Sequence, residues 1–129
     1  MKSSVKLLIL FIVIIVTAFI PPKHSLVGNW TIYGSGNMSI NEHVELKKDG
    51  SYNVYIGDQI GERGFYKLKG SVFSIKNAKP VCGDGYWGKY KIDFYGSDSI
   101  HFILIEDTCS NRVMDIVGVN PGLRRMKEK

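Results

Sequence analysis

Cysteine is scarce in this chain, which contains only Cys82 and Cys109. Because no cysteine precedes Cys82, the sequence argues against a bacterial lipoprotein anchor near the N-terminus. The three histidines, His24, His43 and His101, are scattered and lack the spacing of metal ligands. No nucleophile and base stand out either. We therefore expect no metal site, no cofactor and no catalytic activity.

An excess of charge of one sign is missing from the body of the chain. The 17 basic and 12 acidic residues give a net charge of +5, but this excess lies at the two ends. Lys2 and Lys6 are near the N-terminus, and residues 123–129 add four basic residues against one acidic. The remainder is neutral, so we expect no nucleic acid partner. Residues 123–129 are predicted to be a basic, disordered tail.

The only long apolar run lies at the N-terminus, where residues 7–20 follow two lysines and precede two prolines. The run is shorter than the roughly 20 residues that a membrane span needs, and Val16 and Ala18 are small residues suited to signal peptidase. We predict that residues 1–22 are a signal peptide, with an uncleaved membrane anchor as the alternative. Either places the remainder outside the cytoplasm, as a secreted, periplasmic or cell-surface domain. Only an uncleaved segment would contact the membrane.

The two cysteines suit that compartment. In a small exported domain, Cys82 and Cys109 are expected to form a disulfide bond, because the environment is oxidising and a small core gains from a covalent link. Such a bridge would contribute roughly 3 to 4 kcal/mol to stability.

Helical periodicity is also missing from residues 23–122, where turn residues recur about every eight to twelve positions. This spacing predicts a barrel or sandwich of about eight strands. They are expected at residues 26–33, 38–46, 51–56, 64–69, 71–76, 86–95, 100–105 and 113–119. The Asp49-Gly50 pair is a strong hairpin signal. Residues 100–105 are almost wholly apolar, which predicts a strand buried on both faces.

Alternation along the strands indicates which side chains point inward. In residues 89–94 the charged side chains occupy one face and the apolar ones the other, as in a strand with one wet face. A barrel of about eight strands encloses a space that side chains fill or that one small ligand occupies. The candidates for lining a ligand site are Tyr52, Val54, Phe65, Tyr90, Ile92 and Phe94.

Gly28-Asn29-Trp30, at the head of the first strand, resembles the G-x-W motif that opens lipocalin and related calycin barrels. A second resemblance is to a C…D-x-C-x-x-R pattern of small secreted lipocalin-like domains. The residues that match it are Cys82 and Asp107-Thr108-Cys109-Ser110-Asn111-Arg112. The resemblance covers roughly residues 26–119. It implies a small antiparallel up-and-down barrel over residues 23–122, in which Trp30 plugs the closed end and Arg112 packs over it.

Gly28, Trp30 and Arg112 are therefore the predicted closure residues, and Asp107 is expected to pair with Arg112. The chain departs from full lipocalins in being shorter and in lacking their Asp/Thr-x-Tyr turn signal and their long helix after the last strand. These departures leave the ligand undetermined.

Two functions remain open. One is a non-catalytic exported barrel that binds a small hydrophobic molecule. The alternative is a disulfide-clamped structural or protein-interaction module with a filled core, recognising an unknown protein partner through loops at residues 58–63 and 83–87. Trp87, with Tyr86 beside it, is the candidate surface anchor.

Overall fold

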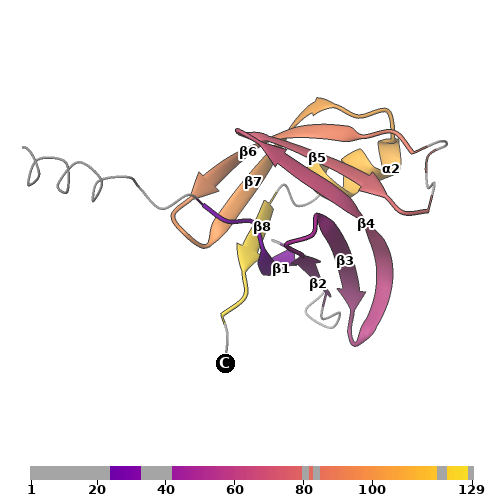
Figure 1. Ribbon diagram of the computed structural model, residues 1–129. Helices are drawn as coiled ribbons and strands as arrows, with labels where there is room; N and C mark the ends of the chain where they lie inside the picture. The colour runs from indigo at the N-terminus through magenta and orange to yellow at the C-terminus, as the bar shows by residue number, and fades with distance from the viewer. Residues whose placement is uncertain (1–23, 33–41, 80–81, 83–84, 119–121, 128–129) are drawn as a thin grey trace, which may run out of the picture.

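The computed structural model describes residues 24–32, 42–79, 82, 85–118 and 122–127 (Figure 1). Eight antiparallel strands, neighbours in chain order, close into one barrel, which confirms the predicted fold class. The strands are β1 (Gly28–Ile32), β2 (Glu42–Leu46), β3 (Ser51–Ile56), β4 (Gln59–Lys69), β5 (Val72–Asn77), β6 (Gly88–Tyr95), β7 (Ser99–Glu106) and β8 (Gly122–Arg125). The predicted signal peptide or anchor, residues 1–22, lies outside the described residues. Within the described ranges, no helix has the length and apolarity to cross a membrane.

The predicted Asp-Gly turn joins β2 to β3. Gly50 has a φ of 85°, and its N–H donates to the Lys47 carbonyl at 3.1 Å. The Asp49 carboxylate accepts from both the Ser51 N–H (2.9 Å) and the Ser51 hydroxyl (2.6 Å). Such side-chain bonds to the local backbone favour a turn over a continued strand, so the hairpin is specified locally.

Strand β4 is longer than the sequence pattern predicts. Its eleven residues begin at Gln59, directly after a tight turn at Gly57 and Asp58. Residues 59–63, expected to be part of a loop, instead pair with β3 from Gln59 opposite Ile56 to Arg63 opposite Asn53. The prediction was wrong because this half of β4 is polar and contains a glycine, features shared by loops and by strand segments with a wet face.

The closing strand was also placed wrongly. Residues 113–119 were expected to form it, but Ser110–Val113 is helix α2 and Met114–Gly118 is a short π-helical turn, η1. Val113, Ile116 and Val117 are spaced i, i+3, i+4, which suits a helical face, and the last two pack against the core. Strand β8 closes the barrel instead.

Strand β8 lies between β1 and β7 (Figure 1). Trp30 pairs with Arg125, and Ile100 pairs with Leu123. Residues 123–125 therefore belong to the barrel and not to a disordered tail. Four residues with one buried leucine have little strand signal of their own, and it is pairing on both sides that holds them.

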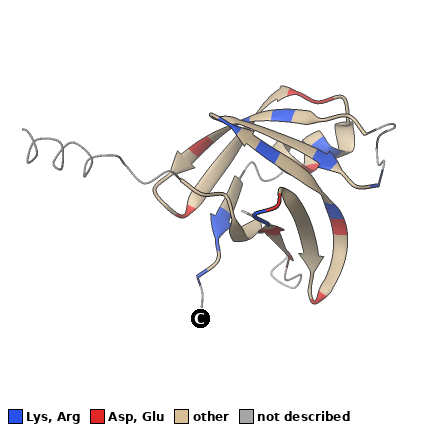
Figure 2. Cartoon of the chain, viewed as in Figure 1, with Lys and Arg blue, Asp and Glu red and all other residues tan. Residues whose placement is uncertain are grey.

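The core is formed by the inward faces of the strands, as alternation predicts. Trp30, Tyr90 and Ile100 are fully buried, and Phe73 packs against Phe102 with ring centroids 5.3 Å apart. Basic and acidic residues are interspersed along the strands (Figure 2), which agrees with the neutral charge of the body.

Strand β7 is buried on one face, and only over its first half. Ile100 and Phe102, which lie on the same face, are buried, whereas His101 between them is partly exposed and Ile103, Leu104 and Ile105 are 43 to 51% exposed. The prediction of a strand buried on both faces is therefore wrong. A run of apolar residues cannot by itself distinguish a strand between two layers from one whose outer face lies at the surface.

Candidate functional site

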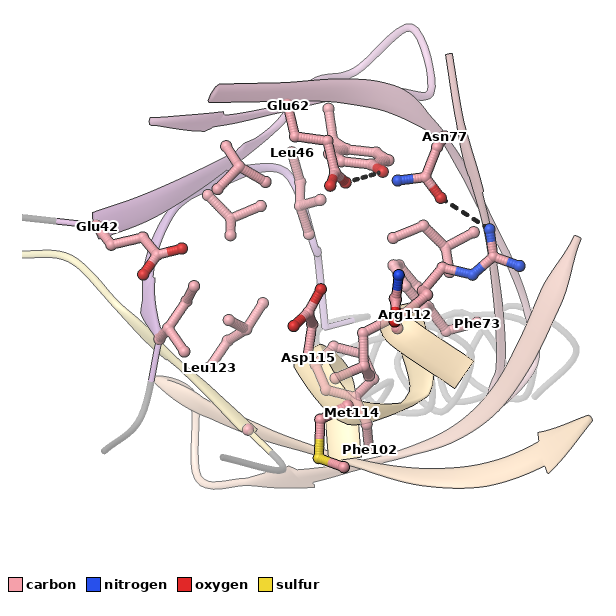
Figure 3. A pocket seen from close by; sticks show the side chains of 18 residues that line it. Glu42, Leu46, Glu62, Phe73, Asn77, Phe102, Arg112, Met114, Asp115 and Leu123 are labelled. Atoms are coloured by element: carbon pink, nitrogen blue, oxygen red, sulfur yellow. Dashed lines mark hydrogen bonds between the residues drawn. The ribbon is translucent and has the colours of Figure 1, made fainter. Parts of the chain in front are cut away.

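A cavity of about 300 Å³ lies inside the barrel (Figure 3). This volume is at the lower end of the range typical of sites for small ligands. Most of the lining is apolar and comes from the strands and η1: Ile32, Val44, Leu46, Val54, Phe73, Ile75, Phe102, Met114, Ile116 and Leu123. Tyr52 and Gly122 add to this wall, and the polar lining consists of Glu42, Glu62, Asn77, Asn111, Arg112 and Asp115.

The cavity has its exposed rim at η1. Met114 is 58% exposed and Asp115 is also exposed, although both line the cavity. Leu46, Tyr52 and Phe73 are each 2% exposed and form its inner wall. The site is therefore a largely apolar chamber that opens beside Met114 and Asp115.

Two of the six predicted lining residues, Tyr52 and Val54, line the cavity. Tyr90 and Ile92 point inward but are buried in the core beside it, at 0% and 2% exposure. Phe94 packs against the core and stacks on His24, with centroids 4.5 Å apart. These three point inward but lie outside the lining.

Phe65 was predicted to point inward, and this is wrong. It is 50% exposed, and its neighbour Tyr66 is the buried residue. The Tyr66 hydroxyl donates to the Lys47 carbonyl at 2.6 Å. Two adjacent aromatic residues in a strand cannot both face the interior, and the sequence does not show which one does.

Tyr52 carries a polar contact into the cavity wall. Its hydroxyl donates to Glu62 Oε1 at 2.6 Å. Burial, followed by this contact with a carboxylate, raises the pKa of Tyr52 far above its usual range. Tyr52 therefore remains a neutral donor at physiological pH.

Arg112 is at the centre of a buried network beside the cavity. It binds Asp107 with both ends of the guanidinium, Nε to Oδ2 at 2.6 Å and Nη2 to Oδ1 at 2.8 Å. Its Nη1 donates to Asn77 Oδ1 at 2.8 Å, and Nη2 also donates to the Tyr86 carbonyl at 3.1 Å. The ion pair expected between Asp107 and Arg112 is thus present, and it is two-pronged.

The charges of this pair are stable at neutral pH. Burial would raise the pKa of Asp107, but hydrogen bonds from Arg112, Tyr90 and the Cys109 N–H outweigh it and lower the pKa. Bonding to Asp107 raises the pKa of Arg112. Burial and the bond to Asp107 likewise keep the Tyr90 hydroxyl protonated, since they raise its pKa. The network has no group poised to exchange protons.

Gly88 in β6 leaves space for the Asp107–Arg112 ion pair to pack against this strand. It is buried, and a methyl group added there would overlap the Asp107 carboxylate and approach Arg112 Nε to 3.1 Å. Only glycine leaves room for the ion pair against β6.

The predicted disulfide joins Cys82 to Cys109, with Cα atoms 5.3 Å apart. Cys109 is 1% exposed and is the residue immediately before α2. The bridge therefore ties the segment between β5 and β6 to the start of the helix that carries Asn111 and Arg112 into the cavity wall.

Trp30 is fully buried, and the arginine over its ring is Arg125 and not the predicted Arg112. The Arg125 guanidinium lies 4.1 Å from the centre of the Trp30 ring, and it donates to the carbonyls of Val27 (3.0 Å) and Ser25 (2.5 Å). The Trp30 indole N–H donates to the Leu26 carbonyl at 2.8 Å. The assignment of Arg112 failed because β8 was read as a tail.

Gly28 lies at the start of β1, beside the Arg125 side chain. Its φ is 137°, a conformation that residues with a Cβ rarely adopt. A Cβ there would come within 2.8 Å of Arg125 Nη1. Glycine thus permits both the backbone turn into β1 and the position of the guanidinium.

We expect Arg125→Ala to lower the free energy of unfolding by roughly 1 to 3 kcal/mol, from the lost cation–π contact and the two backbone carbonyls left without their donor. Urea unfolding followed by tryptophan fluorescence measures this. Arg124→Ala is the matched control, because Arg124 is the next residue and its side chain is 58% exposed. Equal losses in the two variants would contradict the role of Arg125.

Trp87 is not the freely exposed anchor that we predicted. Its ring is half-buried, and Lys67 Nζ lies 4.2 Å from its centre. The neighbouring Tyr86 is 65% exposed. The sequence Gly85-Tyr86-Trp87-Gly88 does not show which of the two rings is covered by a lysine of another strand.

The polar lining was missed by sequence reasoning. Glu42 precedes Val44 and Leu46 at intervals of two, so alternation alone places it on the inner face. Glu62 lies in the part of β4 that was read as a loop, and Asp115 lies in the segment that was read as a strand. Of these three acidic residues, only Glu42 could have been placed on the inner face from the alternation in the sequence.

Comparisons with protein-family models, curated proteins and solved structures gave no match. Among the residues that the structure describes, no three His, Cys, Asp or Glu side chains are grouped so as to hold a metal ion. The cavity is therefore the feature of the described residues that bears most directly on function.

Proposed function

We propose that this chain is an exported, non-catalytic, lipocalin-like barrel that binds a small, largely apolar molecule in its cavity. The observation that carries the proposal is the chamber of about 300 Å³ with an apolar wall, because most proteins of this size fill their interior to high density. The lipocalin-like assignment is supported by the meander barrel, by the G-x-W motif, and by an arginine over the tryptophan ring. The disulfide favours an extracytoplasmic location.

The absence of catalysis is proposed on the state of the buried titratable groups. Tyr90, Asp107 and Arg112 are bonded to one another, and Tyr52 is bonded to Glu62. A general acid or base needs a pKa near the working pH, and the pKa values of these tyrosines, of Asp107 and of Arg112 are all shifted away from it.

The test is a titration of the exported, oxidised protein with N-phenyl-1-naphthylamine, a neutral dye that becomes fluorescent in apolar sites. We expect saturable binding at one site. Val54→Trp should weaken it by at least about tenfold, because the larger side chain enters the chamber; a tenfold change corresponds to about 1.4 kcal/mol. Unfolding by urea checks that the variant still folds.

Ile103→Phe is the matched control, since it also enlarges an apolar side chain but at a position 50% exposed on the barrel exterior. Dye binding that Val54→Trp leaves unchanged would contradict a site in the cavity. No binding at all would favour the alternative, a structural or interaction module that works through its surface, where Tyr86 and residues 103–105 are exposed.

A further inference from the structure

The cavity contains carboxylates that no described cation neutralises. Glu42 on β2, Glu62 on β4 and Asp115 on η1 direct their carboxylates toward its interior (Figure 3). The ion pairs between described residues involve none of these three. Glu62 accepts a hydrogen bond from Tyr52, which is a neutral donor. The cavity lining therefore carries an excess of negative charge, at two half-buried positions and at one exposed position on the rim.

Arg112 does not offset this charge. It is the only lysine or arginine among the lining residues, and its Nε, Nη1 and Nη2 already donate to Asp107, Asn77 and the Tyr86 carbonyl. Asp107 neutralises it, with a side chain that is 0% exposed. An anionic ligand would meet three carboxylates and a guanidinium whose charge is already paired.

Asn77 adds an uncharged polar side chain to the lining. It is 8% exposed, and its Oδ1 accepts from Arg112, which fixes the orientation of the amide. The Nδ2 atom points toward the cavity (Figure 3), where a ligand acceptor or a water molecule can reach it.

We infer that the ligand is a small organic cation, with an apolar body in the chamber and an ammonium group among Glu42, Glu62 and Asp115. This inference rests on the proposed function of the cavity and adds the charge of its ligand. An ammonium group has only donors to offer, and the carboxylates are acceptors. Attraction between opposite charges is stronger beside an apolar wall than in bulk water, and repulsion of an anion is stronger for the same reason.

The experiment compares octylamine, octanol and octanoate at pH 7, each displacing N-phenyl-1-naphthylamine from the exported, oxidised protein. The three share one apolar body and differ in the charge of the head group. We expect octylamine to bind roughly tenfold more tightly than octanol, the size of one charge-assisted hydrogen bond, and octanoate to bind most weakly. Added salt should reduce the difference.

The double variant Glu42→Gln, Asp115→Asn should bring the ratio of the octylamine and octanol affinities close to one. Glu106→Gln is the control, because this carboxylate is 67% exposed on β7 and is absent from the cavity. Octanol binding without any preference for octylamine would overturn the cation inference while the cavity proposal stands. Failure of the dye and all three compounds to bind would overturn both.

Discussion

Replacing Arg112 with methionine is expected to lower the free energy of unfolding by roughly 3 to 5 kcal/mol, because it leaves a buried carboxylate without its partner. The Asp107 side chain is 0% exposed, and Arg112 supplies two of its hydrogen bonds. Asn77 and the Tyr86 carbonyl lose a donor in the same variant. Urea unfolding followed by circular dichroism measures the loss.

Lys89→Met is the matched control. Lys89 and Glu106 also form an ion pair, with Nζ and Oε2 3.0 Å apart, but both side chains are about half exposed or more. Such surface pairs contribute roughly 0 to 1 kcal/mol. A loss in Arg112→Met no larger than in Lys89→Met would show that the buried network does not hold the fold.

The same network makes a prediction about acid. Because the pKa of Asp107 is lowered in the folded protein, its contribution to stability is complete above the unfolded value of about 3.9 and is lost as the pH falls through the folded value. The difference in stability between the unaltered protein and Asp107→Asn should therefore be constant near neutrality and shrink below about pH 4. A difference that widened in acid would contradict this assignment.

Removing the disulfide has the second large effect. The double variant Cys82→Ser, Cys109→Ser should lose roughly 3 to 4 kcal/mol of stability, the chain-entropy value for a loop with a sequence separation of 27. It should also bind the dye more weakly, because Cys109 immediately precedes the helix that brings Asn111 and Arg112 to the cavity. Thermal unfolding and dye titration measure the two effects.

Reductant provides the internal control for that prediction. It should destabilise the unaltered protein and leave the double serine variant unchanged, since the variant has no bridge to reduce. An equal thermal midpoint with and without reductant in the unaltered protein would contradict a stabilising role for the bridge.

Much of the barrel could be predicted from the sequence because its signals are local. Seven strands follow from alternation and turn chemistry, and the Asp49-Gly50 hairpin is fixed by contacts between neighbouring residues. Strand β8 could not be predicted in this way. The sequence of Arg124 and Arg125 is typical of a solvated tail. Only pairing with β7 and with β1, which lies more than 90 residues earlier in the chain, makes these residues a strand.

The candidate site was less predictable than the fold. Alternation identifies side chains that face inward, such as Tyr52 and Tyr90, but it does not tell which of them border an empty space. That depends on how β2, β3, β5 and η1 pack together. Carboxylates on an inner face are also hard to recognise, because acidic residues are exposed in most proteins.

The seam between β1 and β8 has a consequence for how the barrel forms. Every other neighbouring pair of strands is consecutive in the chain, whereas the Thr31 hydroxyl bonds to the Arg124 carbonyl across 93 positions. The entropy of closing so long a loop is lost before the contacts that reward it are made. We therefore expect the hairpins to form first and the two edges of the meander to meet last. Strand β8 is joined to each of its two neighbours by only three residue pairs, so we expect the ring to open first at this strand.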